Sequence, residues 1–103
     1  MVSQREIGKA GITAKVLERL RKLGCAALKI HGSPLQPAAV DVLAVAPGGR
    51  SVALEVKRPG QAATPRQARF LAVWGEAGAV VGTVHSADEA EALLREAGCV
   101  RVG

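Results

Sequence analysis

Residues 41–57 read Asp-Val-Leu-Ala-Val-Ala-Pro-Gly-Gly-Arg-Ser-Val-Ala-Leu-Glu-Val-Lys, and this stretch decides the fold. Two short apolar runs flank a Pro-Gly-Gly-Arg cluster, a pattern that predicts a β-hairpin. Asp41 stands at the outer end of the first strand. Glu55 and Lys57 stand at the outer end of the second strand and, being two residues apart, point to the same face. The hairpin therefore gathers two acids and a lysine at one corner.

The length of the hairpin loop decides whether these charges meet. Asp41 shares a face with Glu55 and Lys57 only if it lies opposite one of them, which requires an odd number of loop residues. A two-residue turn at Gly48-Gly49 would place Asp41 opposite Val56 instead, unless a bulge restored the register. We therefore expect a loop of three or five residues, or a bulge. The opposite face is then apolar, with Val42, Ala44, Val52, Leu54 and Val56.

Composition indicates a basic globular protein. A chain of 103 residues is expected to form one domain, residues 1–103, around one core. Residues 1–75 carry twelve Lys and Arg against four Asp and Glu, whereas residues 76–103 carry two against five. A basic surface beside acidic site residues suits a protein that acts on a polyanion. We see neither a membrane-spanning run nor a signal peptide, and expect a cytoplasmic location with no membrane partner.

The rest of the chain predicts three helices and two or three further strands. A first helix lies within residues 3–23, and it begins either at a Ser3–Glu6 capping box or at Thr13. A strand follows at Cys25–Ile30. Thr64-Pro65 begins a second helix that Gly78 ends. Residues 79–84 read as a strand buried on both faces, residues 87–97 as a helix, and residues 99–102 as a short edge strand. This order predicts an α/β fold with a central mixed sheet, in which the strands on either side of the second helix are parallel.

Several side chains outside the hairpin have two interpretations. Lys15, Arg19 and Lys22 form either a solvated helix face or a row that binds phosphates. Lys29 is a charge within a strand, so it reaches either an edge or a site. Gln67 shares the inward face of the second helix with three residues that we expect in the core, Phe70, Leu71 and Trp74. We expect Cys25 and Cys99 to be buried thiols.

The charged corner has the chemistry of a metal site. Two neighbouring carboxylates resist ionising together unless a cation joins them, and hard oxygen ligands favour Mg²⁺ or Mn²⁺. A lysine beside such a metal can position an attacking water and stabilise charge on phosphorus, which suits phosphodiester hydrolysis. The alternative is a hairpin whose end charges are solvated, with an ion pair between Lys57 and Asp41.

These residues resemble the PD-(D/E)XK nucleases, and within them the small stand-alone VRR-NUC domains. The resemblance covers roughly residues 13–95. It rests on Ala27-Leu28-Lys29-Ile30, the Ser33-Pro34 loop, Asp41, Pro47-Gly48-Gly49-Arg50, Glu55-Val56-Lys57, Thr64-Pro65-Arg66-Gln67, and Gly78 followed by a Val-rich strand and Ser86. It implies a restriction-endonuclease-like αβββαβα core, similar in fold to archaeal Holliday-junction resolvases. It also implies a Mg²⁺- or Mn²⁺-dependent DNA endonuclease that can act as a homodimer on branched DNA.

The resemblance also implies roles for residues. Asp41, Glu55 and the Val56 carbonyl would hold the metal, Lys57 would act at the nucleophile or scissile phosphate, and Gln67 would support the site. The residues that we expect to contact DNA are Lys15, Arg19, Lys29, Ser33 and Arg58.

Two positions depart from the family pattern. Val40 replaces the usual proline before the metal-binding Asp. The glutamate that the family often has on the first helix would fall at Thr13, and Glu6, about two turns upstream, could substitute only if the helix extends that far. The departures leave two functions open. One is an active nuclease for structured or branched DNA, and the other is a non-catalytic DNA-binding or partner-binding domain of the same fold.

Overall fold

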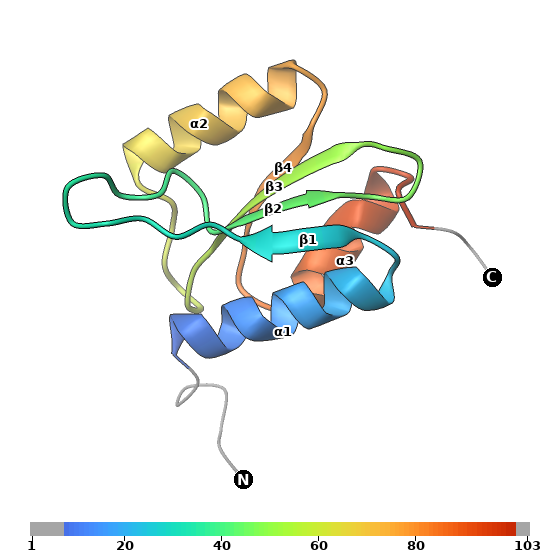
Figure 1. Ribbon diagram of the computed structural model, residues 1–103, viewed down its shortest axis with the longest axis horizontal. Coiled ribbons are helices and arrows are strands. Elements are labelled where there is room, and N and C mark those ends of the chain that lie inside the picture. The colour runs from blue at the N-terminus through green and yellow to red at the C-terminus, as the bar shows by residue number, and fades with distance from the viewer. Residues whose placement is uncertain (1–7, 101–103) are drawn as a thin grey trace, which may run out of the picture.

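The computed structural model describes residues 8–100 of the chain (Figure 1). The order of the elements is the one that the sequence predicts. They are α1 (Lys9–Lys22), β1 (Ala26–Lys29), β2 (Val42–Val45), β3 (Ser51–Val56), α2 (Pro65–Glu76), β4 (Val80–Val84) and α3 (Ala87–Glu96).

The four strands form one mixed sheet in the order β1-β2-β3-β4. β2 is antiparallel to both β1 and β3, whereas β3 and β4 are parallel and joined through α2. Helices α1 and α3 lie together on one side of the sheet, and α2 lies on the other (Figure 1). The predicted mixed sheet with a parallel β3–β4 pair is confirmed.

The hairpin has the register that the charged corner needs. Val42 lies opposite Leu54 and Val45 lies opposite Ser51, so five residues, 46–50, separate the paired strands. Both glycines of the loop adopt left-handed backbone, with φ of 94° at Gly48 and 96° at Gly49, a conformation that a Cβ atom would strain. The expected odd-numbered loop is confirmed.

The face opposite the charges is the main core. The five predicted apolar residues of β2 and β3 are all buried there. They pack against Ile12, Val16 and Leu20 of α1 and against Ala90 and Leu94 of α3. Cys25 and Cys99 are buried free thiols beside this cluster, as expected.

The α2 face carries a smaller cluster, and it corrects one prediction. Leu71 is buried there with Val40 and Ala53. Phe70 and Trp74 are only half-buried, with stacked rings whose centroids are 5.0 Å apart. They lie at the rim of the cluster because a single helix does not cover this face of the sheet.

The structure corrects the expectations at both ends of the fold. Helix α1 begins at Lys9 after Gly8, so Thr13 lies inside the helix and is not its N-cap. The proposed Ser3–Glu6 capping box lies outside the described residues. In the sheet formed by residues 8–100, β4 is an edge strand, and within it only Val80 and Val84 are buried. Residues 99–100 form no strand, and residues 101–102 lie outside the described range.

Within residues 8–100, no helix combines the length and the apolar character needed to cross a membrane.

Candidate active site at the end of the β2–β3 hairpin

Asp41 and Glu55 meet where the hairpin strands end. The Asp41 N–H donates to the Leu54 carbonyl at 3.2 Å, just beyond the last paired residues Val42 and Leu54, which ties Asp41 to the end of β3 next to Glu55. The Asp41 carboxylate accepts a hydrogen bond from the Val56 N–H at 2.8 Å. The Asp41 side chain is 14% exposed and the Glu55 side chain is 0% exposed. The hairpin thus holds two carboxyl groups together in a largely water-excluded position.

Lys57 joins the two acids, as its spacing predicts. Its Nζ lies 3.7 Å from Glu55 Oε1, and its side chain is 14% exposed. The alternative interpretation was a hairpin with solvated end charges and an ion pair between Lys57 and Asp41. The structure differs from it, because Lys57 pairs with the buried Glu55. The three charges of the hairpin therefore converge.

The first helix contributes Lys9, which the sequence analysis missed. Lys9 Nζ lies 3.1 Å from Asp41 Oδ2 and 3.1 Å from Glu55 Oε1. Thr13, one turn further along α1, is buried, and its hydroxyl donates to the Lys9 carbonyl at 2.9 Å. The signal was available, since residues at i and i+4 share a helix face and Thr13 had been placed at the site. The first helix thus presents an ammonium group to the two carboxyl groups.

The two carboxyl groups differ in their affinity for protons. Burial, reinforced by the hydrogen bond and charge of Asp41, raises the pKa of Glu55 from 4.5 to about 7. Burial acts in the same direction on Asp41, but hydrogen bonds with Glu55, the Val56 N–H and Lys9 together lower its pKa below the usual value. Near neutral pH the pair therefore keeps a proton on Glu55 for much of the time while Asp41 stays ionised.

A solved structure described as a VRR_NUC domain matches this chain with a TM-score of 0.69 and 25% sequence identity. The match covers 84% of this chain and 94% of the other chain. The chain has the fold of a VRR-NUC domain. No protein-family model matches the chain, and a search of the curated proteins finds no match either.

The carboxyl pair of this VRR-NUC fold fits a hard divalent cation. Glu55 Oε2 is buried and has no hydrogen-bond partner among the described residues, so one oxygen of the site is left for a ligand. The donors are carboxylate oxygens, which Mg²⁺ and Mn²⁺ prefer. Residues 8–100 contain no cluster of three or more His, Cys, Asp or Glu side chains, so any further ligands would be backbone carbonyls or water. Glu6, the other candidate acid, lies outside the described residues.

Gln67 borders the site but also has a structural task. It lines a groove of about 440 Å³ together with Lys9, Thr13, Lys29 and Asp41. Its Oε1 accepts from the Thr64 N–H at 2.9 Å, and its own N–H donates to Thr64 Oγ1 at 3.3 Å. This reciprocal capping box begins α2 of the VRR-NUC fold, so Gln67 connects the helix N-terminus to the groove.

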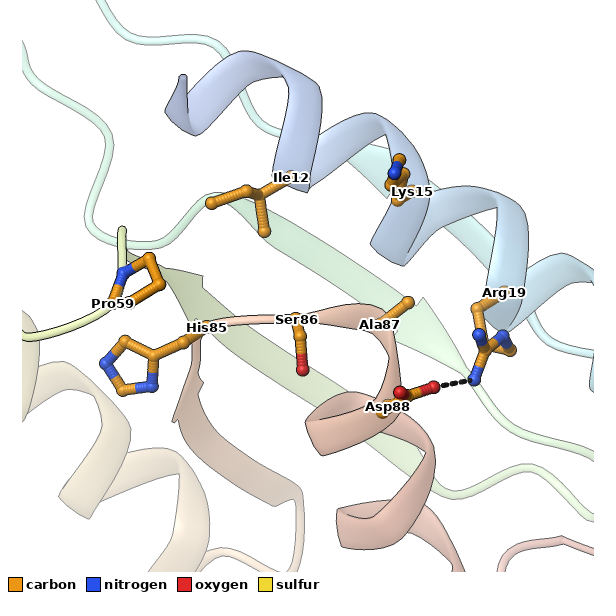
Figure 2. Close-up of a pocket in the computed structure, with 8 residues that line it drawn as sticks. All are labelled: Ile12, Lys15, Arg19, Pro59, His85, Ser86, Ala87 and Asp88. Carbon is orange, nitrogen blue, oxygen red and sulfur yellow. Dashed lines mark hydrogen bonds and ion pairs between the residues drawn. The ribbon is translucent and has the colours of Figure 1, made fainter. Parts of the chain in front are cut away.

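The expected DNA-contacting residues fall into two groups. Lys29 lines the groove beside the acids, while Ser33 and Arg58 are exposed in the loops that follow β1 and β3. Lys15 and Arg19 instead line a separate pocket of about 230 Å³ between α1 and the start of α3, seen in Figure 2. Of these five residues, Lys29 is the one that shares the groove with Asp41.

The basic row of α1 is largely committed to internal ion pairs. Arg19 Nη1 lies 2.9 Å from Asp88 and 3.0 Å from Glu91, the first of which is drawn in Figure 2. Lys22 lies 3.2 Å from Glu18, which is exposed as expected. These pairs favour the interpretation of the row as a solvated face that docks α1 onto α3.

The sequence analysis assigned no role to His85, which also lines this pocket. Its Nδ1 lies 3.0 Å from Glu89 and its Nε2 lies 2.8 Å from the Gln61 carbonyl. Both bonds raise the pKa of His85, the one to Glu89 most strongly. The histidine thereby connects the loop after Lys57 to α3.

Proposed function

We propose that this chain is a divalent-metal-dependent endonuclease that hydrolyses phosphodiester bonds in DNA, with a preference for branched or otherwise structured DNA. The observation that carries the proposal is the convergence of Asp41, Glu55 and Lys57 at one end of a hairpin, within a fold similar to a VRR_NUC domain.

Each residue of the corner has a task in this proposal. Asp41, Glu55 and the Val56 carbonyl hold Mg²⁺ or Mn²⁺, which supplies a water of lowered pKa and neutralises charge on the phosphate. The Val56 N–H fixes the orientation of the Asp41 carboxylate through its 2.8 Å bond. Lys57, held beside Glu55, donates to the attacking water or to a non-bridging phosphate oxygen as negative charge develops. Gln67 and Lys29 border the groove in which the scissile strand would lie.

Branched DNA and a homodimer belong to the same proposal. One chain carries one such site and cuts one strand, so paired cuts across a junction call for two copies. The sheet face beside α2 exposes Leu28 and Val45, at 55% and 46%, which supplies apolar surface that a second copy could cover. A light-scattering mass near twice the chain mass of 10.6 kDa is the expected result.

The test is cleavage of matched branched and linear DNA in Mg²⁺, in Mn²⁺ and in EDTA. We expect cutting that EDTA abolishes and that falls by at least about 100-fold in both variants, because Asp41→Asn weakens a proposed metal ligand and Lys57→Met removes the cation proposed to stabilise charge in the transition state. Glu18→Gln, an exposed change on α1, is the matched control and is expected to cut like the unchanged protein.

A second candidate function has its own supporting observation. Lys9 already neutralises the two carboxylates, and the described part of α1 offers no acid to the site. A non-catalytic DNA-binding or partner-binding domain of the same fold would have this arrangement. The cleavage test separates the two: if no DNA is cut with either metal, or if cutting persists in both Asp41→Asn and Lys57→Met, the nuclease proposal is wrong.

A further inference from the structure

The position of Lys9 suggests a specific relation between this residue and the metal. Its ammonium group lies at the same distance, 3.1 Å, from one oxygen of Asp41 and one oxygen of Glu55. It therefore bridges two carboxyl groups from two different strands, in the place where a cation shared by both would lie.

A divalent cation cannot join these oxygens while Lys9 remains. Asp41 Oδ2 is already occupied by Lys9 and by the Val56 N–H, and Glu55 Oε1 by Lys9 with Lys57 nearby. Positive charges a few ångströms apart in a partly buried site repel each other strongly. Metal held by these two oxygens thus requires the Lys9 ammonium to move away, and a cation bound through the remaining oxygen, Glu55 Oε2, would still be repelled by that ammonium.

Lys9 can move, whereas the other groups of the site are held. Its side chain is 43% exposed, and it projects from the first residue of α1 on a flexible stem. It also lines the open groove of about 440 Å³, into which the ammonium can swing. Lys57, by contrast, is 14% exposed and extends from the end of a central strand.

We propose that Lys9 is an internal counter-ion that occupies the carboxyl pair in the metal-free protein and that a divalent cation must displace. The proposal rests on the proposed function, since it concerns the same metal site. Its consequence is quantitative, because the apparent metal affinity equals the intrinsic affinity multiplied by the fraction of molecules in which the site is open. Lys9 therefore raises the metal concentration at which the site loads.

The test is direct Mn²⁺ binding without DNA, measured by titration calorimetry or by loss of the free-Mn²⁺ electron paramagnetic resonance signal. If the lysine occupies the pair in about nine molecules of ten, Lys9→Met binds Mn²⁺ about tenfold more tightly than the unchanged protein. Lys9→Gln, a second neutral variant, is expected to behave in the same way. Lys9→Arg keeps the cation and retains the weaker affinity.

Lys22→Met is the matched control, because it removes one positive charge from the exposed far end of the same helix. Its Mn²⁺ affinity is expected to stay within about twofold of the unchanged protein, since exposed distant charges are screened. Equal or weaker Mn²⁺ binding in both neutral Lys9 variants overturns the counter-ion proposal while leaving the metal site intact. Absence of saturable Mn²⁺ binding in every variant overturns the metal-dependent function itself, and the counter-ion proposal with it.

Discussion

Glu55 is the one charged residue that is buried among residues 8–100. Its side chain is 0% exposed and its pKa is raised from 4.5 to about 7. The folded protein therefore binds this proton more tightly than the unfolded chain does. The sign of the linkage follows: the free energy of unfolding falls as pH rises from about 4.5 to about 7, and this contribution levels off above pH 7.

Urea unfolding at several pH values between 5 and 8, in metal-free buffer, tests this prediction. We expect the unchanged protein to lose up to about 3 kcal/mol of stability across that window through Glu55, and Glu55→Gln to lose much less. His85 also has a raised pKa and titrates with the same sign, so the quantity to compare is the difference between the two proteins. Parallel pH profiles for the two proteins would contradict the assignment.

The sequence predicted the site of Asp41, Glu55 and Lys57 better than it predicted the contribution of α1 to that site. Asp41, Glu55 and Lys57 could be placed because a strand has a period of two and the loop has a fixed parity. Lys9 lies one turn before Thr13, but the glycines at 8 and 11 left open whether the helix extends back to it. Only tertiary packing, in which the carboxyl pair meets the first turn of α1, determines its role.

At the scale of elements, the N-terminus of α2 connects stability to the groove. Gln67 forms one half of the capping box and Thr64 the other. We expect Gln67→Ala and Thr64→Ala each to lower the free energy of unfolding by about 1 kcal/mol, because each removes a partner of the first backbone N–H groups. Gln67→Glu keeps an acceptor oxygen at the same position and should retain the stability of the unchanged protein.

Cleavage by the same variants distinguishes the capping role of Gln67 from a role in the active site. Thr64→Ala should cut like the unchanged protein once corrected for the folded fraction, because Gln67 keeps its amide. Gln67→Glu should cut roughly tenfold more slowly, because it adds a carboxylate beside Asp41 and repels phosphate. If Gln67→Glu cuts at the full rate, Gln67 is a capping residue alone.

Most elements were predictable because glycine, proline and capping residues separate them clearly. Thr64-Pro65 and Gly78 give the bounds of α2 almost to the residue. Thr13 misled because threonine favours N-caps, whereas here burial places it inside the helix, with its hydroxyl bound to the carbonyl of Lys9 four residues earlier. The pattern of Val80–Val84 likewise could not show that this strand lies at an edge, because edge position depends on the whole sheet.

At the scale of the whole molecule, fewer basic side chains can bind DNA than the net charge of +5 suggests. Among residues 8–100, five arginines have internal partners: Arg19 binds acids of α3, Arg21 binds the Ala27 carbonyl, Arg50 binds the carbonyls of Gly78 and Ala97, Arg66 binds the Pro37 carbonyl, and Arg95 binds Glu91. Such contacts fix these side chains to the fold. We therefore expect the cations nearest the carboxyl pair to contribute most to DNA binding.

Lys9 and Lys57 contact the acids themselves, and the next cations along the groove and the chain are the exposed Lys29 and Arg58. Lys29 lines the groove at the end of β1, and Arg58 follows Lys57 in an exposed loop. A cation that neutralises a phosphate releases counterions from the DNA. Lys29→Ala and Arg58→Ala should therefore each weaken DNA binding about equally for every sequence, and each should reduce the slope of log affinity against log salt by about 1. Fluorescence anisotropy in EDTA over a series of NaCl concentrations measures both effects apart from cleavage.

Lys22→Ala is the control, because it removes the same charge at the far end of α1, and it should leave the slope unchanged. Equal slopes in all these proteins would mean that DNA approaches another face. A slope that falls for Lys22→Ala alone would mean that DNA contacts the C-terminal end of α1 instead.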